Sequence, residues 1–322
     1  MESRLRYFIC FIAVIALLIA SPQSAQGCRE ALDVCAELII PSLFPFFILT
    51  GIITGVGIPQ IIGKYMKPVS KRLFGVSGEG ATALFMGLVG GYPMAALYIA
   101  ELRKQNIIGK DEAERLMGFC SCSGFGFIIG AVGCGVFGSL RCGILLYLTH
   151  ALGAVTVGIL MKKALGELPF TSCEAEATDF ENISFGSLLT SSVRNAVISM
   201  LNVCGFVVLF SAVIKVLDAW GIVSLMLDYI SELTGAELTW LRSLYCGIFE
   251  LGCAFGEMRS LAPSSSSLTL AAFILGWGGL SVQLQCISAV HDTKIKGTLH
   301  YTGHLLLAVI SAIYTYILTV FF

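Results

Sequence analysis

Long apolar stretches without an acidic or basic side chain alternate with short polar segments along most of this chain. Each stretch has about 20 residues or more, the length that an α-helix needs to cross the hydrocarbon core of a bilayer. The pattern predicts an all-α polytopic membrane protein, with spans in residues 7–27, 38–63, 81–100, 116–140, 142–161, 195–214, 260–290 and 297–322.

Helix-breaking residues interrupt several of these stretches. Gly90, Gly91, Tyr92 and Pro93 lie in the middle of the stretch at 81–100. Lipid offers no hydrogen-bond partner to the backbone groups that such a break frees, so the break must be buried in protein or line a cavity. We therefore predict re-entrant hairpins at 81–100 and 238–258, and further breaks at 121–124 and 276–281.

The two halves of the chain share one order of features: a span, an amphipathic segment, a broken segment and a glycine-rich break in a longer span. Sequence identity between the halves is thin, so the predicted repeat depends on this order and spacing. The basic start, apolar middle and small-residue end of residues 1–28 fit a signal anchor, and cleavage of this segment stays open. The predicted organisation is an N-terminal membrane helix at 1–28, membrane repeat 1 at 29–161, a cytoplasmic linker at 162–187, membrane repeat 2 at 188–296 and a C-terminal membrane helix at 297–322.

The amphipathic segments of the two halves carry opposite charge. The first contains Lys64, Lys67, Lys71 and Arg72, which the positive-inside rule places in the cytoplasm. Its counterpart at 218–237 contains acidic residues and neither lysine nor arginine. The two segments are therefore expected on opposite sides of the membrane. This reversal predicts two inverted-topology repeats with re-entrant or broken helices.

Composition supports the membrane class and narrows the function. The 322 residues are 56% hydrophobic and 13% charged, outside the usual range of soluble domains. A net charge of −1 without basic and aromatic clusters gives no indication of nucleic-acid binding. The 12 cysteines are scattered without a CxxC pair, and no HExxH, GxSxG or P-loop motif occurs. The sequence therefore predicts neither an enzyme nor a bound cofactor or metal.

The paired breaks supply the candidate residues for substrate binding. Helix N-termini at such breaks expose N–H groups and a partial positive charge, which suit a carboxylate or another anion. Close packing of glycines between helices is the alternative explanation. The candidates are Gly90, Gly91, Tyr92, Pro93, Ser121, Ser123, Gly124, Gly278, Gly279, Ser281 and Gln283.

Glu250 is the candidate residue for ion coupling, with a proton or a sodium ion as the coupling ion. Apolar residues flank it, and an acidic residue inside a membrane segment is costly and often functional. A solvated position at the membrane surface, or an ion pair with Arg194 or Arg242, would explain it equally well. We interpret His150 and His304, each alone in its apolar surroundings, as packing residues.

Four longer motifs together resemble a known family. They are PSLFPFFILTGII at 41–53, GGYPMAALYIAELRKQNIIGKDEAERLMGFCSCSG at 90–124, FIIGAVGCGVFG at 127–138 and LGWGGLSVQLQ at 275–285. Over nearly its whole length the chain is similar to the sporulation integral membrane proteins of the nucleoside-recognition, or Gate-domain, superfamily. The resemblance implies an integral protein of a cell membrane with a role in endospore formation, in the outer forespore membrane. Members are implicated in moving dipicolinate, a small aromatic dicarboxylate, and relatives include concentrative nucleoside transporters.

One motif departs from the family pattern. Where members have FCNNSGP, this chain has FCSCSGF at 119–125, so a hydroxyl and a thiol replace two amides. A different carboxylate or a nucleoside-like solute therefore stays open beside dipicolinate. The expected partners are a small-molecule solute and the lipid bilayer, with no nucleic acid and with an oligomer left open. The predicted function is a membrane transporter of a small anionic solute. The alternatives are a non-transporting membrane scaffold or assembly factor for sporulation, and a nucleoside-type transporter.

Overall fold

The computed structural model describes residues 7, 11, 15–168 and 184–321, and these residues form helices and loops without strands. The predicted all-α class is therefore confirmed. Among the described residues, five helices are long and apolar enough to cross a membrane, or six if one bent pair counts as a span. Most of the predicted linker at 162–187 and much of the N-terminal helix at 1–28 lie outside the described residues.

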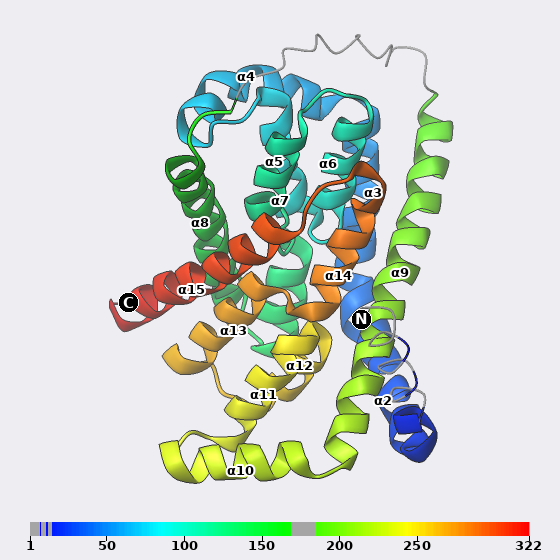
Figure 1. The fold of residues 1–322 in the computed structure, drawn as a ribbon, viewed down its shortest axis with the longest axis vertical. Coiled ribbons are helices and arrows are strands. Elements are labelled where there is room, and N and C mark those ends of the chain that lie inside the picture. Colours follow the sequence, from blue (N-terminus) through cyan, green and yellow to red (C-terminus); the bar gives the residue numbers. More distant parts are fainter. Residues whose placement is uncertain (1–6, 8–10, 12–14, 169–183, 322) are drawn as a thin grey trace.

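The helices occur in the same order in both halves of the chain (Figure 1). A long helix precedes a short amphipathic helix, a hairpin of two half-helices, a broken helix and a final long helix. The first half contains α2 (Ser21–Val34), η1 (Cys35–Ile39), α3 (Ile40–Gly55), α4 (Ile58–Leu73), α5 (Gly78–Gly90), α6 (Met94–Lys104), α7 (Lys110–Cys120), η2 (Gly126–Val136) and α8 (Leu140–Leu165). The second half contains α9 (Phe185–Ala219), α10 (Ile222–Thr234), α11 (Leu238–Phe249), α12 (Leu251–Met258), α13 (Ser265–Trp277), α14 (Gly279–Ala289), η4 (His291–Thr293) and α15 (Thr298–Phe321). The inverted relation between the halves stays a prediction.

The two amphipathic helices α4 and α10 lie at opposite ends of the molecule's longest axis (Figure 1). The basic end of α8 joins the α4 end, because Lys162 Nζ donates hydrogen bonds to the carbonyl groups of Lys71 and Arg72 at 3.2 and 2.9 Å. We call these ends the α4 side and the α10 side. The α4 side carries the basic residues that the positive-inside rule assigns to the cytoplasm.

The first long helix differs from the sequence pattern. The polar segment at 28–37 separated two predicted spans, whereas the chain stays helical from Ser21 to Gly55. α2 packs along α9, and Glu30 of α2 forms a 2.7 Å ion pair with Lys215 of α9. The polar segment can therefore stay helical, because its charge is paired with a neighbouring helix. The structure therefore has one continuous helix where the sequence pattern shows the end of one apolar stretch and the start of the next.

Positive backbone angles end the half-helices at two of the breaks. Gly91 has φ 78°, and Gly278 and Gly279 have φ 81° and 75°. A residue with a β carbon is strained in this region, whereas glycine adopts it freely. The other two breaks use extended backbone, at Ser121 after α7 and at Glu250 between α11 and α12. All four predicted breaks are present.

Candidate functional site

The four helix breaks meet inside the helix bundle. A β carbon on Gly91 would lie 2.8 Å from the backbone nitrogen of Gly124, and one on Gly279 would lie 3.1 Å from the backbone nitrogen of Glu250. These approaches join the breaks in pairs, one pair in each half of the chain. Tyr92 connects the pairs, because its hydroxyl end lies 3.4 Å from the β-carbon position of Gly278.

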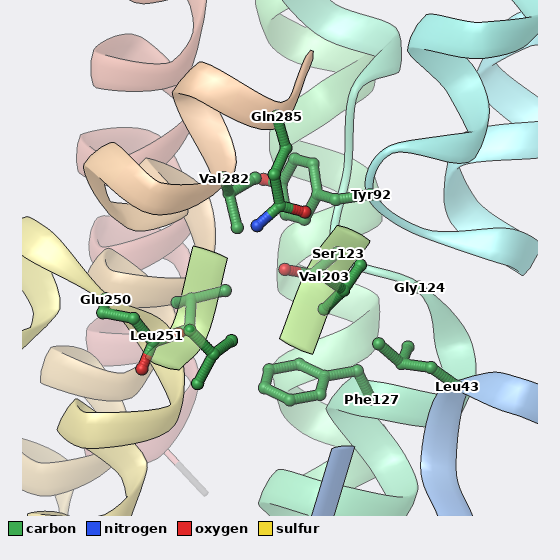
Figure 2. A pocket seen from close by; sticks show the side chains of 11 residues that line it. Leu43, Tyr92, Ser123, Gly124, Phe127, Val203, Glu250, Leu251, Val282 and Gln285 are labelled. Atoms are coloured by element: carbon green, nitrogen blue, oxygen red, sulfur yellow. The ribbon is translucent and has the colours of Figure 1, made fainter. Parts of the chain in front are cut away.

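A central cavity of about 40 Å³ lies where these breaks meet (Figure 2). Figure 2 shows Tyr92 and Ser123 on one side of it and Glu250 and Leu251 on the other. Four lining residues have polar side chains, and most of the others are apolar. The lining consists of Leu43, Tyr92, Ser123, Gly124, Phe127, Val203, Val207, Glu250, Leu251, Val282 and Gln285.

Two polar side chains of the wall bind one carbonyl group of α13. The hydroxyl groups of Tyr92 and Ser123 each donate a hydrogen bond of 3.3 Å to the Leu275 oxygen. The backbone nitrogen of Ser123 donates to His150 Nε2 at 3.1 Å. These bonds connect the α5–α6 and α7–η2 breaks to α13 and α8. A movement of α13 would therefore displace the cavity wall directly.

Glu250 lies in the wall with its carboxylate turned onto its own helix. Its Oε2 accepts a 2.6 Å hydrogen bond from the backbone nitrogen of Cys253, which makes Glu250 the N-cap of α12. The residue is 2% exposed, so the solvated surface position does not apply. Arg242 pairs with Asp218 at 2.6 Å and Glu257 at 2.9 Å, so the alternative ion pair between Glu250 and Arg242 is wrong.

Some predicted substrate-binding residues line the cavity and others only shape the breaks. Tyr92, Ser123 and Gly124 line it, together with the coupling candidate Glu250. Gln283 turns its amide nitrogen to the Trp277 carbonyl at 2.5 Å, within the α13–α14 break. The predicted residues outside the lining are Gly90, Gly91, Pro93, Ser121, Gly278, Gly279, Ser281 and Gln283. Solute binding by any of these residues stays a prediction.

Sequence reasoning chose Gln283 over Gln285 as the candidate donor of α14, and it did not place the apolar residues of the wall. Val282 and Gln285 lie three positions apart on α14 and face the cavity together. This spacing is the signal that would have favoured Gln285 over Gln283. The apolar wall carries no such signal, because a valine that faces a cavity and one that faces another helix have the same pattern. Among the described residues, no group of three His, Cys, Asp or Glu could hold a metal ion.

Two further cavities share α9 with the central one. On the α4 side, a cavity of about 520 Å³ lies between α3, α6 and the first turns of α9. On the α10 side, a cavity of about 240 Å³ lies between α2, α9, α11 and α12. Val207 lines both this cavity and the central one. The three cavities follow one another along α9, whose lining residues are Leu188, Ser191, Ser192, Asn195, Ala196, Ile198, Ser199, Val203, Val207, Ser211, Ile214 and Lys215.

The fold and the site define a polytopic membrane protein in which paired helical hairpins and broken helices enclose a central cavity. Residues 36–142, which include the first-half breaks, match the Gate family, described as nucleoside recognition. The chain is 31% identical to the sporulation integral membrane protein YlbJ of Bacillus subtilis (strain 168), over 96% of this chain and 81% of that protein. The chain therefore belongs to the YlbJ family of sporulation integral membrane proteins, as the sequence motifs indicated. No solved structure matches it.

Proposed function

We propose that this protein is a transporter that moves a small anionic solute across the membrane. The observation that carries the proposal is the row of three cavities along α9, from the α4 side to the α10 side. The smallest cavity lies where the four breaks meet. Broken helices at membrane depth form the binding sites of many secondary transporters, because they present backbone groups to a solute away from lipid.

The wall of the central cavity favours a solute with an apolar ring and a few polar groups. Phe127 and Leu251 supply apolar surface, and Tyr92, Ser123 and Gln285 supply hydroxyl and amide groups. A small aromatic carboxylate combines these features, and dipicolinate is one example that the family resemblance implies. The cavity of about 40 Å³ has room for water, whereas small-molecule sites enclose about 300 Å³ or more. Binding therefore requires the walls to move apart.

Glu250 is the coupling residue in this proposal. Two negative charges about 4 Å apart repel by several kcal/mol at an effective dielectric near 20, so an ionised Glu250 opposes entry of an anion. A proton or a sodium ion on the carboxylate would remove that repulsion. In the closed arrangement the carboxyl group is buried and its Oε2 accepts a hydrogen bond from the N–H group of Cys253. Entry of the solute and neutralisation of Glu250 are therefore expected together.

The name of the Bacillus relative supports a role in sporulation. We place the transporter in the outer forespore membrane, on the strength of the family resemblance. An anion made on one side of that membrane could then reach the other side through the α9 cavities.

Uptake by the purified full-length protein in vesicles tests this function. The solutes are dipicolinate, other small carboxylates and nucleosides, and Gly91→Leu serves as the inactive control. Saturable uptake of a carboxylate by the parent protein alone supports the proposal. Uptake of nucleosides alone would favour a nucleoside-type transporter. No uptake of any solute by folded protein would favour a membrane scaffold or assembly factor.

A further inference from the structure

Three buried histidines lie behind the central cavity, His150 on α8 and both His300 and His304 on α15. The rings of His300 and His304 are 4.3 Å apart between centroids. His304 also packs against Tyr92, with its Nδ1 3.5 Å from the hydroxyl oxygen. Since Tyr92 lines the cavity, the cluster is one side chain away from it.

One ring nitrogen of each histidine is buried without a hydrogen-bond partner: Nδ1 of His150 and Nε2 of His300 and His304. The opposite nitrogens are occupied. His300 Nδ1 lies 3.1 Å from the Met117 carbonyl oxygen, and His150 Nε2 accepts from the Ser123 backbone. Buried polar atoms are nearly always paired, so neighbouring unpaired nitrogens mark a place where something binds. Since His300 Nδ1 donates to the Met117 carbonyl group, its unpaired Nε2 is the nitrogen without a proton and can accept one, whereas the unpaired Nδ1 of His150 already carries the ring proton.

The surroundings of the pair supply no counter-charge. The helices α7 and α13 that pack on α15 contribute backbone carbonyl groups. In the part of the chain that the structure describes, neither ring forms a hydrogen bond or ion pair with a carboxylate. The titratable side chains that face the pair are His150 from α8, Tyr92 from the α5–α6 break and, beside Tyr92, the thiols of Cys122 and Cys286.

We propose that His300 and His304 form a proton-binding site that controls the Tyr92 wall of the central cavity. The proton comes from water and adds to a ring nitrogen, and on release it returns to water, so only an N–H bond forms and breaks. Its entry is on the α4 side, where α15 begins at the exposed Thr298, two residues before His300. The role in transport rests on the proposed function, whereas the binding site does not.

Tyr92 connects the proton to the cavity. Its single hydroxyl proton has two acceptors within reach, the Leu275 oxygen at 3.3 Å and His304 Nδ1 at 3.5 Å. A protonated His304 carries a proton on both ring nitrogens, so Nδ1 can donate but can no longer accept from Tyr92. The dry site then holds a cation without a partner, which water would stabilise. The central cavity on the other side of Tyr92 is large enough for water, so acid favours a hydrated, open cavity.

Access to the cavity can be measured without a solute. In full-length Leu43→Cys protein, a small alkylating reagent reports access to the wall position, and mass spectrometry quantifies the modified peptide. Native Cys134 is exposed and serves as the reference, because acid lowers the thiolate fraction of both cysteines. Between about pH 7.5 and about pH 5.5, which spans the titration of an ordinary histidine, we expect the rate ratio Leu43→Cys to Cys134 to rise several-fold.

Substitution of the histidines supplies the decisive comparison. His304→Asn keeps a polar group near the Nδ1 position but takes up no proton, and the rate ratio in this variant should stay constant within about twofold. His300→Asn is the second variant, and His291→Asn, which changes an exposed histidine, is the matched control that should retain the full rise. The proton site is overturned if the parent shows no rise, or if both His304→Asn and His300→Asn rise as the parent does.

Dipicolinate exchange in vesicles at the same pH values then tests the role of the site. We expect the rate to depend on pH in the parent protein and in His291→Asn, and to depend less on pH in His304→Asn, which keeps Glu250. A parent protein that passes the alkylation test but moves neither dipicolinate nor any other solute would contradict the transport function and leave the proton site standing. An unchanged pH profile in His304→Asn would overturn the control of transport by this site.

Discussion

Gly91 and Gly124 pack backbone against backbone at the centre of the molecule. A β carbon on Gly91 would lie 2.8 Å from the Gly124 nitrogen, and one on Gly124 would lie 2.7 Å from the Gly91 nitrogen. Neither residue therefore has room for a side chain. The tip of the α5–α6 hairpin and the α7–η2 break can meet only because both residues are glycines.

Replacement of the break glycines should abolish transport. In Gly91→Leu and Gly279→Leu the new side chain meets backbone of the neighbouring break, and the positive φ adds about 1–2 kcal/mol of strain. Gly205→Leu on α9 is the control, since no atom outside its own stretch of helix lies within 4 Å of its β-carbon position. Vesicle uptake and the amount of inserted protein are the two measurements. Normal uptake by both break variants would show that the breaks do not form the transport site.

The amphipathic helices should be accessible from opposite sides of the membrane. Lys67→Cys on α4 and Asp228→Cys on α10 place single cysteines at the two ends of the molecule, in a background depleted of other cysteines. A membrane-impermeant thiol reagent should label one position in right-side-out vesicles and the other in inverted vesicles. Labelling of both positions from one side would contradict the inverted repeat.

Glu250→Gln should separate exchange from accumulation. The amide oxygen can still accept from Cys253, and the neutral side chain imitates the protonated acid. We expect exchange of solute across the membrane without accumulation against a gradient, and with a pH response that now comes from the histidine site alone. Glu250→Ala removes the cap as well and should lower stability by about 0.5–2 kcal/mol. Accumulation by Glu250→Gln with the pH response of the parent would remove this residue from the coupling step.

Loss of Arg115 should destabilise the α4 side. This fully buried residue of α7 donates hydrogen bonds to the carbonyl groups of Phe74, Gly75 and Gly166 at 3.1, 3.2 and 2.8 Å. In Arg115→Met these acceptors lose their donor, at about 1–3 kcal/mol for each one left buried. Thermal unfolding in detergent should show a lower midpoint than the parent, whereas the exposed Arg141→Met should leave it unchanged. Equal midpoints in the two variants would contradict this role.

Glu112 should give the protein a pH-dependent stability. Burial raises the pKa of this carboxyl, although the 2.6 Å hydrogen bond from the Ser77 nitrogen opposes the shift. The residue lies on α7, outside the candidate spans. A carboxyl with a higher pKa in the folded protein destabilises the fold once it ionises, so stability should fall as pH rises from the unfolded value of about 4.3 through the folded one.

Glu112→Gln tests this dependence, because its amide oxygen still accepts from Ser77 but does not titrate. Thermal unfolding of this variant between about pH 4 and about pH 7 should lose part of the fall seen in the parent. The exposed Glu101→Gln should keep the whole of it. A parent-like slope in Glu112→Gln would show that another group is responsible.

The helix breaks could be predicted from sequence because their signals are local. Gly91 stands beside a second glycine and close to a proline, and Glu250 stands alone among apolar residues, which marks each as unusual within a span. The cavity wall depends on packing between helices that are distant in the sequence, and the identity of a residue such as Val203 does not indicate whether it faces a cavity or another helix. The continuous helix through Glu30 was missed for the same reason, since its partner Lys215 lies far along the chain. The contact of His304 with Tyr92 was missed because Tyr92 comes from the other half, although the four-residue spacing of His300 and His304 places these two on one helix face.

The two hairpin tips occupy the same place in the order of helices but differ in chemistry. The α5–α6 tip is neutral and offers the hydroxyl group of Tyr92, whereas the α11–α12 tip carries Glu250, whose carboxylate already occupies the N-terminus of α12. A cargo between the tips would therefore meet two unlike faces. A symmetrical dicarboxylate would become unsymmetrical on binding, because the carboxyl group beside Tyr92 could stay ionised while the one beside Glu250 would share a proton with it. Such a solute would cross the membrane in one orientation, with the same carboxyl group leading.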